Sequence, residues 1–577
     1  MKRIYMIFAL LVSAGVFIGC DSFLDTENLT KKDTSNFPKT EDDAKQMIAG
    51  IYAVMNNGLE EPESDPFFVF ELAGDDRLGG GSQSNYPAQS LDRLMNCKIS
   101  AFEPFWRTRY AGIFRANSAI ATMDNVASWT SEKTKDNLLS EAYFLRGFYY
   151  FQLVQTFGQV PLVVSTVAEN LPKAEADEIY AQIASDLKTS IELGSNAKWP
   201  DLNVGHATKW VAEAIMARVW LFYTGFYNKT ELPLAEGGSV SKSQVVAWLE
   251  DCIQNSGHAL VSDQRNLWPY TNPYTAKDYP YARDNGLVWE SDENIENMFA
   301  VKMSNAGTYE DGLQRHNRIV EYFGLRKSAT AFPFYPQGYS NGPVCEAIWK
   351  DWGNDPDYAG DYRRVGSICK RADELPDYPG DDKKECENTD LVAKKYLGCG
   401  AYDDAGTLYE SYAYFYGGDN DKQTGLTQSL VWLRFADVLL MHAELTDGKQ
   451  IYNGKNGLNA VRQRAKLNDL PYSLEALKKE RRYELCFEAM RWNDLRRWGD
   501  VSVIVANQEG NDILNEGKPG KYTFGSNDFM QRYNATKGGF FKLPDSQVTL
   551  SEGVLVQNDG WGEGTDHNKG DLPYFKK

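Results

Sequence analysis

The chain has 577 residues, of which 42% are hydrophobic and 24% charged, and its formal net charge is −19. Loss of a leader that holds Lys2 and Arg3 would bring this charge to −21. An acidic chain argues against nucleic-acid binding, which needs a basic surface, and against broad contact with anionic lipid. A neutral ligand such as a glycan or a peptide is compatible with this charge.

The first 19 residues predict a lipoprotein signal peptide. Lys2 and Arg3 precede an almost wholly apolar run over residues 4–18, which is too short to span a bilayer. A small residue, Gly19, stands directly before Cys20. In bacterial lipoproteins such a cysteine is acylated and becomes the new N-terminus, so we expect a lipid on Cys20. The alternative is an ordinary signal peptide in which Cys20 has no such role.

Residues 20–40 are mostly polar and are predicted to form an extended tether from the lipid to a body over residues 41–577. Beyond the leader, no segment reaches about 18 consecutive apolar residues, the length that a membrane-spanning helix needs. We therefore expect the membrane contact to be made by acyl chains alone.

Helical periodicity begins after Thr40, a predicted N-cap that precedes an acidic first turn. Apolar residues at helical spacing predict further helices over residues 102–123, 141–157, 178–193, 208–226, 429–445 and 474–498. Several of them follow one another closely and carry small residues where neighbours would meet. The sequence therefore predicts a mainly α fold, with a tetratricopeptide-like scaffold of helical hairpins over about 41–260 and 429–500.

Between these two parts, residues 261–428 lose the helical period and become rich in Gly, Pro, Asn, Asp and aromatic residues. We predict a large loop-rich insertion there, with residues 297–303 (NMFAVKM) as its clearest strand. Long irregular stretches inside a compact domain are usually functional. Residues 501–577 are predicted to form a loop-rich C-terminal segment.

The insertion holds many aromatic residues that could stack on the apolar faces of sugar rings. The predicted ligand contacts there are Trp268, Tyr270, Trp289, Tyr309, Tyr322 and Trp349. The competing interpretation is strong, because most Tyr and Trp residues in a protein of this size belong to the core or are half-buried.

A second candidate contact is the loop over residues 73–86. It holds Asp75, Asp76 and Arg77 beside three glycines and ends in Asn85 and Tyr86. The glycines would permit a tight exposed loop. A turn with a local salt bridge is the alternative.

Motifs for catalysis are weak. Ser340 lies in a G-x-S-x-G pattern, but prolines surround it, where a nucleophile elbow needs a strand before and a helix after. Glu480, Glu484 and Glu488 share one helix face, yet arginines are interleaved with them, which favours a structural ion-pair network over an acid/base pair. No catalytic residue and no cofactor is predicted.

Metal binding has no convincing motif either. The histidines are scattered and no cysteine pair has C-x-x-C spacing. Asp355, Asp357 and Asp361 could collect calcium, but their spacing is not that of an EF-hand, and a solvated acidic turn is the favoured interpretation. Seven cysteines remain besides Cys20. They could form up to three disulfides or stay as free buried thiols, and the sequence leaves both possibilities open.

Several blocks together resemble the SusD/RagB family of surface lipoproteins from Bacteroidetes-type bacteria. They comprise the Cys20 start followed by DSFLDTE, EAYFLRGFYYFQLVQTFGQVPLV at 141–163, DYRR at 361–364, VWLRFADVLLMHAEL at 431–445, LNAVRQRA at 458–465, ERRYELCFEAMRWNDLRRWG at 480–499 and FFKLPDSQVTLSEGVLVQNDGW at 540–561. Each block is weak alone, but they occur in family order from end to end.

The resemblance implies a scaffold of tetratricopeptide-like helix pairs with an irregular insertion. It also implies a nutrient-binding lipoprotein on the outer face of the outer membrane, acting as a lid on a TonB-dependent, SusC-like transporter rather than as an enzyme. The matching blocks are scaffold and carry no ligand residues over. Only Asp75, Asp76 and Arg77 match a loop that contacts ligand in the family.

Glycan capture is the leading functional interpretation. Peptide capture, as in some relatives of this family, is the first alternative. A secreted α-helical glycosidase that uses carboxylates of the insertion, such as Glu346 and Asp351, is the second.

Overall fold

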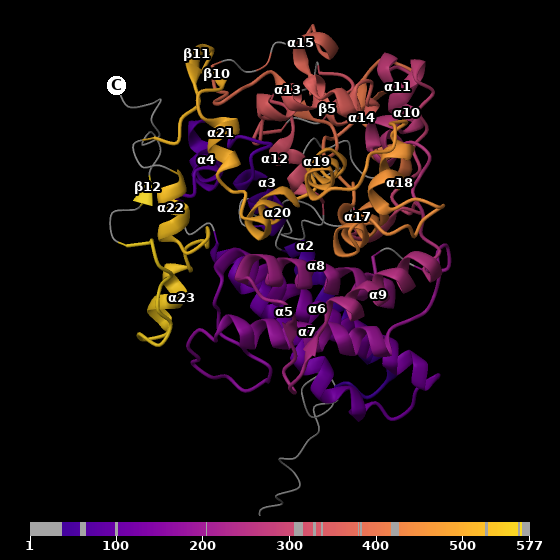
Figure 1. The fold of residues 1–577 in the computed structure, drawn as a ribbon, viewed down its shortest axis with the longest axis vertical. Helices are drawn as coiled ribbons and strands as arrows, with labels where there is room; N and C mark the ends of the chain where they lie inside the picture. Colours follow the sequence, from indigo (N-terminus) through magenta and orange to yellow (C-terminus); the bar gives the residue numbers. More distant parts are fainter. Residues whose placement is uncertain are drawn as a thin grey trace, which may run out of the picture.

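The computed structural model describes residues 37–57, 65–97, 102–202, 205–304, 316–326, 331–335, 338–378, 380, 383–416, 426–525, 529–562 and 566–567. Helices dominate this part of the chain (Figure 1). None of the described helices is long and apolar enough to cross a membrane. Cys20 and the predicted tether up to residue 36 lie outside the described residues.

The scaffold is built from helices that pack on their neighbours in chain order. The long ones are α2 (Glu41–Asn57), α5 (Glu103–Thr122), α6 (Glu132–Phe157), α7 (Ala176–Leu193), α8 (Lys209–Tyr227) and α9 (Lys242–Asn255). Each packs against the next, from α2 on α5 through to α8 on α9. They form the indigo-to-magenta half of Figure 1.

The scaffold resumes after the insertion with α17 (Phe435–Leu445), α18 (Gly457–Arg464), α19 (Leu474–Glu484) and α20 (Arg491–Trp498). Helix α17 packs on α9 and α20 packs on α8, so the two parts form one continuous stack. The predicted mainly α, hairpin-based fold is confirmed.

Capping residues explain where several predicted helices begin. The Thr40 hydroxyl accepts a hydrogen bond from the Asp43 backbone N–H at 3.1 Å, and the Thr208 hydroxyl accepts one from Val211. Helix α6 starts earlier than predicted, because Ser131 caps it through the N–H of Thr134. The first turns of α6 are polar, so a search for apolar residues at helical spacing does not detect them.

Two predicted helices are wrong in part. The segment 429–445 begins as a strand, β9 (Leu430–Arg434), whose residues are buried on both faces and pair antiparallel with β4 (Asn297–Val301). An apolar run buried on both sides has no period that separates strand from helix. The predicted strand at 297–303 is confirmed as β4.

The predicted helix over 474–498 is interrupted between α19 and α20. Phe487 and Ala489 adopt positive φ angles of 64° and 60°. The Ala489 N–H is drawn to the buried Glu71 carboxylate at 2.6 Å, and Glu488 bonds to Arg434. Contacts with distant residues therefore break a helix that local propensity would continue.

The insertion consists of short elements joined by loops. Its helices are α10 (Pro273–Ala276), α11 (Pro280–Asp284), α12 (Arg318–Phe323), α13 (Glu346–Asn354), α14 (Tyr362–Ser367), α15 (Arg371–Glu374) and α16 (Ala413–Tyr416). Its strand pairs are β5 (Ile368–Lys370) with β6 (Leu391–Ala393), and β7 (Gly400–Tyr402) with β8 (Leu408–Glu410), both antiparallel. All described sheets have two strands, so helices and loops carry the fold.

The remaining elements flank this region. Two lie in the chain between the scaffold helices α2 and α5, namely α3 (Pro66–Ala73) and α4 (Tyr86–Asp92). The C-terminal segment contributes α21 (Val503–Gln508), α22 (Phe529–Ala535), α23 (Asp545–Leu550) and the hairpin of β10 (Asp512–Asn515) with β11 (Lys518–Lys521). The pairs β2 (Leu232–Pro233) with β3 (Ser239–Val240) and β1 (Asn96–Cys97) with β12 (Asp566–His567) complete the list.

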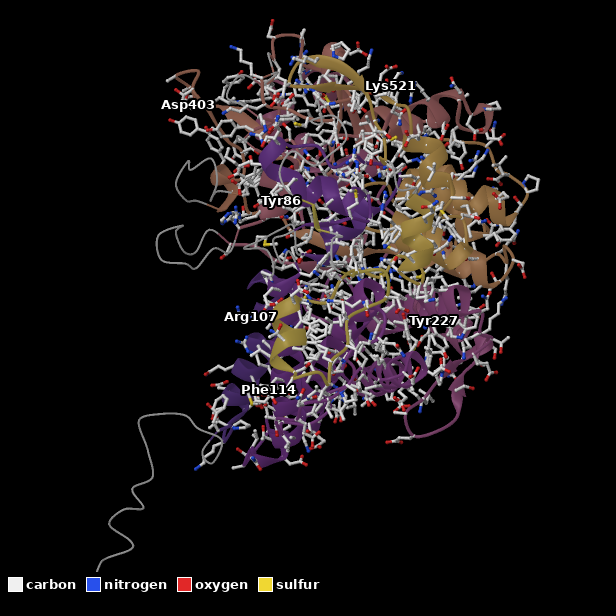
Figure 2. All side chains as sticks on the ribbon, turned by 90° about the vertical axis from the view of Figure 1, so that its left-hand side faces the viewer. Tyr86, Arg107, Phe114, Tyr227, Asp403 and Lys521 are labelled. Carbon is white, nitrogen blue, oxygen red and sulfur yellow. The ribbon has the colours of Figure 1, made fainter. Side chains whose placement is uncertain are left out.

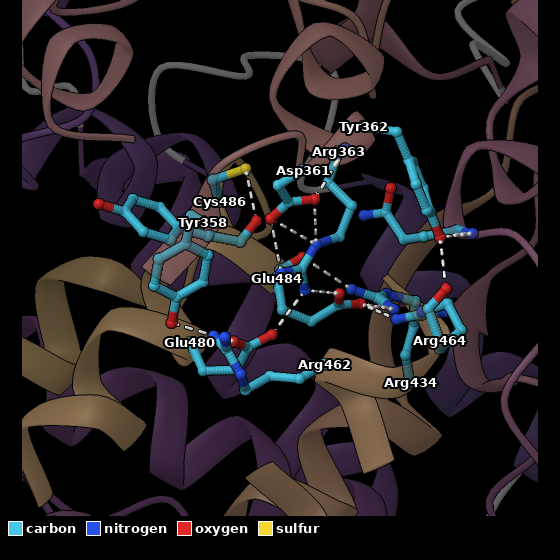
Figure 3. Close-up of polar contacts among 12 residues, drawn as sticks. Tyr358, Asp361, Tyr362, Arg363, Arg434, Arg462, Arg464, Glu480, Glu484 and Cys486 are labelled. Carbon is cyan, nitrogen blue, oxygen red and sulfur yellow. Dashed lines mark hydrogen bonds and ion pairs between the residues drawn. The ribbon is translucent and has the colours of Figure 1, made fainter. Parts of the chain in front are cut away.

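A buried ion-pair network joins the insertion to the scaffold (Figure 3). Arg363 contacts Asp361 at 2.8 Å and, from the scaffold, Glu480 at 2.7 Å and Glu484 at 2.8 Å. Arg434 adds contacts to Glu484 and to Glu488. The predicted structural role of these three glutamates is confirmed.

Six cysteines, those whose side chains the structure describes, are not crosslinked. Cys252, Cys345, Cys369, Cys386, Cys399 and Cys486 are all buried free thiols. Their surroundings are apolar enough to raise the pKa of each thiol through burial. They behave as small core residues rather than as reactive or bridging groups.

Candidate functional site

The predicted ligand loop at 75–77 is buried and bound internally. Asp75 is fully buried and contacts Arg491 at 2.6 Å, and Asp76, 4% exposed, contacts Arg482 at 2.8 Å. Arg77 contacts Glu71 at 2.6 Å. These three side chains hold the loop to the scaffold, so we no longer assign them to ligand contact.

Burial raises the pKa of both aspartates and the neighbouring arginines lower it, but the net shift differs between the two. Burial raises the pKa of Asp75, but the positive charges of Arg491 and Arg482 lower it by more, so the pKa of Asp75 lies below its usual range. Burial raises the pKa of Asp76 to about 6, and the charge of Asp75 adds to that rise. The pair therefore shares the positive charge of Arg482 unequally.

The glycines beside these residues allow a close approach of two chain segments. Leu78 donates its N–H to the Pro343 carbonyl at 2.9 Å, and Gly81 donates to the Ser340 carbonyl at 2.7 Å. Gly80 has φ +65°, and a Cβ there would lie 2.2 Å from Cδ of Pro343. The loop is tight as predicted, but it is buried, not exposed, because segment 338–344 covers it.

Two of the predicted aromatic contacts belong to the interior. Trp268 is 2% exposed and lies edge-on to Tyr396 with ring centroids 5.7 Å apart. Tyr270 is fully buried and donates its hydroxyl to the Gly366 carbonyl at 2.8 Å. Neither ring has a free face for a sugar, so their assignment as ligand anchors is withdrawn.

The other aromatic candidates are distributed over separate surfaces. Trp289 is half-buried against Tyr412 and Phe415. Trp349 is half-buried under the Arg364 guanidinium, whose carbon lies 3.6 Å from the ring centroid, so that face is occupied. Tyr309 lies outside the described residues.

Tyr322 and the end of the 73–86 loop come together in what we call the Tyr322 cluster: Asn85, Tyr86, Tyr322, Arg326 and Tyr339. All five side chains are partly exposed. Tyr322 and Tyr339 meet edge-to-face with centroids 5.1 Å apart. Arg326 donates from Nη2 to Oδ1 of Asn85 at 2.9 Å and lies 5.9 Å from the Tyr339 ring. Aromatic faces and polar donors therefore share one surface.

Local structure fixes this cluster from both chain segments. Ser82 donates its N–H and its hydroxyl to Oδ1 of Asn85, which sets the side chain at the start of α4. The Asn341 N–H donates to the Tyr322 carbonyl at 2.9 Å, which ties α12 to the segment that holds Tyr339. Figure 2 shows Tyr86 on the side of the molecule that also presents Arg107 and Phe114.

Sequence reasoning named Tyr86 and Tyr322 and placed Asn85 in the same candidate loop, but it missed Arg326 and Tyr339. Tyr339 and Ser340 lie in the G-x-S-x-G pattern, which the sequence suggests only as the setting of a possible Ser340 nucleophile. Ser340 instead accepts a hydrogen bond from the Arg326 N–H at 3.0 Å and donates one to Glu385 at 3.1 Å. The density of Tyr, Ser, Asn and Gly there was the usable signal.

The carboxylates considered for catalysis or calcium binding form ion pairs or hydrogen bonds with other groups of the protein. Glu346 and Asp351 lie on one short helix, α13, and contact Lys350 and Arg482. Asp355 accepts from the Asp357 N–H at 3.0 Å. Asp361 caps α14 and contacts Arg363, so these acids serve as helix caps and ion-pair partners.

A groove lies on the scaffold half, between α5, the loop over 161–171 and α23. Its volume is about 1090 Å³, and Trp106, Tyr110 and Arg107 are in its wall. Several exposed apolar residues lie on the bordering elements or shortly after α23: Phe114, Val164, Val167, Leu550, Val554 and Val556. Leu550, which lines the groove, is 73% exposed, and Val556 is 63% exposed.

Two family models match the sequence. One, described as starch-binding and associating with the outer membrane, matches residues 22–221. The other, described as the SusD family, matches residues 349–561. A SusD-like protein from Formosa agariphila is 21% identical over 520 residues, which cover 85% of this chain and 89% of that protein.

Solved structures share the fold. A laminarin-binding SusD-like protein has a TM-score of 0.68 at 22% identity, covering 91% of this chain and 100% of that one. Surface glycan-binding protein A from Bacteroides thetaiotaomicron, in complex with laminarihexaose, has a TM-score of 0.67 at 16% identity, covering 91% and 100%. At these identities the likeness establishes the architecture alone.

Proposed function

Since this chain belongs to the SusD/RagB family, we propose that it binds glycans at the outer membrane and delivers them to a transporter. The Tyr322 cluster is the proposed binding surface. Its tyrosine rings would stack on sugar faces, and the donors of Asn85 and Arg326 would bind hydroxyl or acidic oxygen atoms of the ligand. The solved relatives named for laminarin and laminarihexaose support glycans as the ligand class.

One observation carries this proposal. The hydrogen bond between Asn85 and Arg326 joins a loop of the scaffold's first part to the insertion, and the half-exposed rings of Tyr322 and Tyr339 lie beside that junction. A rigid junction holds these groups in place before a ligand arrives, which lowers the entropy cost of binding.

We propose that the chain acts by binding and not by hydrolysis. Glycosidases need two carboxyl groups on opposite sides of the scissile bond. The candidates Glu346 and Asp351 belong to the same helix, and each is bound to a basic side chain. Three glutamates, Glu480 and Glu484 of α19 and Glu488 of the following turn, form buried ion pairs with arginine and lysine side chains.

We further propose that the groove beside α5 receives the partner, a SusC-like TonB-dependent transporter. Helix α2, which follows the predicted lipid tether, packs directly on α5, so a lipid on Cys20 would bring this half of the body toward the membrane. The exposed side chains Leu550 and Val556 supply the apolar area that a protein partner would cover.

Isothermal calorimetry on a panel of neutral polysaccharides and a mixed peptide digest tests the ligand class. Micromolar to millimolar binding to at least one glycan is expected, with no heat from the peptides. Binding to peptides alone would replace this proposal with the peptide-capture alternative. Membrane fractionation of the Cys20→Ser variant tests the anchor, and retention of that variant in the outer membrane would refute it.

A further inference from the structure

Arg326 is held in position through its backbone as well as its side chain. Its N–H donates to the Ser340 hydroxyl at 3.0 Å, and its carbonyl accepts a hydrogen bond from the Tyr378 hydroxyl. Its Nη2 donates to Asn85 at 2.9 Å. The guanidinium group is thus oriented within the Tyr322 cluster instead of being free to sweep through solvent.

The charge of Arg326 is not matched by an acid of the described part of the chain. No carboxylate lies within 4 Å of it among the described residues, and its Nε is buried without a hydrogen-bond partner. Neighbouring arginines differ, because Arg77 contacts Glu71 and Arg371 contacts Glu385. In a chain of net charge −19, an arginine with no acidic partner among the described residues is not due to a shortage of acids.

Asn85 presents a second unmatched donor at the same place. Its Oδ1 is occupied by the Ser82 N–H, the Ser82 hydroxyl and Arg326. These three donors fix the orientation of the amide, and Nδ2 makes no hydrogen bond to another described residue. Beyond the bond from Arg326 to Asn85, the donors Nδ2 of Asn85 and Nε of Arg326 therefore have no acceptor among the described residues.

We propose that the Tyr322 cluster selects glycans that carry negatively charged oxygen groups, either the carboxylate of a uronic acid or a sulfate ester. This inference rests on the proposed glycan-binding function. Arg326 would contact the anion by charge-assisted hydrogen bonds, with Asn85 as a second donor and the tyrosines against the sugar rings.

The overall negative charge of the protein does not oppose this at contact range. Charges separated by more than about 8 Å are largely screened at physiological ionic strength, so the many distant acids have little effect. The contact between Arg326 and a bound anion lies inside that distance and persists. Local charge, not net charge, then decides which glycans bind.

Matched polymer pairs isolate the effect of charge. Calorimetry would compare polygalacturonate with its methyl ester, and dextran sulfate with dextran, using the full chain. The wild-type protein is expected to bind at least one charged polymer at least about tenfold more tightly than its neutral counterpart. Preference for the first pair assigns a carboxylate and preference for the second assigns a sulfate.

Three variants locate the effect. Arg326→Gln is expected to weaken binding of the charged polymer at least about tenfold, whereas Arg283→Gln, at an exposed arginine beside Asp284, leaves it unchanged. Asn85→Asp keeps the shape of the residue and a good helix N-cap while supplying Arg326 with a carboxylate. That variant is expected to fold normally and to lose the preference for charged glycans.

The outcomes separate this inference from the function on which it rests. If the wild-type chain binds neutral polysaccharides such as laminarin or xyloglucan and neither charged polymer, the inference is wrong and the proposed function stands. Equal affinity for both members of each pair, unaffected by Arg326→Gln, also overturns it. If no polysaccharide of either kind binds, the proposed function and the inference both fail.

Discussion

The Asn85 amide oxygen and the Arg326 guanidinium meet at 2.9 Å although 241 positions separate the two residues in the chain. This contact brings the end of the glycine loop against the insertion. Around it, the rings of Tyr322 and Tyr339 stay partly exposed, while the predicted anchors Trp268 and Tyr270 are enclosed in the core.

Tyr339→Ala is expected to weaken glycan binding without unfolding the protein. An aromatic face in contact with an apolar surface contributes about 0.5–1.5 kcal/mol, which corresponds to a loss of several-fold to about tenfold in affinity. The matched control is Tyr402→Ala, at another partly exposed tyrosine of the insertion that packs on Phe332. Calorimetry that finds equal losses for both variants would remove Tyr339 from the site.

Gly80→Ala is expected to destabilise the protein more than Gly286→Ala. Both glycines have φ near +65°, at +65° and +63°, so the backbone cost of about 1–2 kcal/mol is shared. Only at Gly80 would the new Cβ meet another atom, Cδ of Pro343 at 2.2 Å, whereas Gly286 faces open space. Overpacking adds about 1–3 kcal/mol. Urea unfolding measures the difference, and equal costs would contradict the close approach of the two segments.

Arg363→Met is expected to cost about 3–5 kcal/mol of unfolding free energy, because it leaves buried carboxylates without their counter-charge. Arg363 is fully buried and contacts Asp361, Glu480 and Glu484. The exposed Arg283→Met change is expected to cost less than about 1 kcal/mol. Chemical denaturation that shows similar small losses for both would mean that the network of Figure 3 contributes little.

Stability is expected to fall as pH rises because of Glu213. Burial raises the pKa of Glu213 to about 9, and nearby Asp251 takes the closer contact with Lys209, 2.6 Å against 3.6 Å. The folded protein therefore holds a proton that the unfolded chain releases above about pH 4.3. This stabilisation is complete below that pH and is lost progressively as pH rises toward 9.

Glu213→Gln mimics the neutral carboxyl and removes this titration. Its unfolding free energy is expected to decline less between pH 5 and pH 8.5 than that of the wild-type chain. Urea titrations at both pH values give the comparison, and Glu475→Gln, at an exposed acid of α19, is the control. Parallel pH profiles for wild type and Glu213→Gln would show that Glu213 is ionised in the folded state.

The sequence was informative where local patterns decide structure. Capping at Thr40, the apolar period of α5 and α8 and the strand at 297–301 follow from neighbours in the chain. An ion-pair role of Glu480, Glu484 and Glu488 is also expected from the arginines interleaved with them, but their partners are distant in the chain: Arg363, Arg434 and Lys395. The capping, the helical period and the strand need no knowledge of which segments meet, whereas the identity of these partners does.

The site depends on contacts that no local pattern records. Asp75 and its partner Arg491 are 416 positions apart, and nothing near Asp75 indicates that a distant arginine would cover it. Trp268 and Tyr270 looked available because their segment is rich in turn residues, yet that segment folds inward against Tyr396 and Gly366. Burial of an aromatic residue in an irregular region depends on the whole fold, so exposure could not be assigned beforehand.

The central claim is that the Tyr322 cluster captures a glycan without cleaving it. The most direct measurement is native electrophoresis of the full chain through gels containing a panel of charged and neutral polysaccharides, with released reducing ends assayed in the same samples. The account predicts retardation by at least one polysaccharide, its loss in a Tyr322→Ala/Tyr339→Ala double variant that remains folded, and no new reducing ends. Retardation that persists in the double variant, or release of reducing ends by the purified protein, would contradict it.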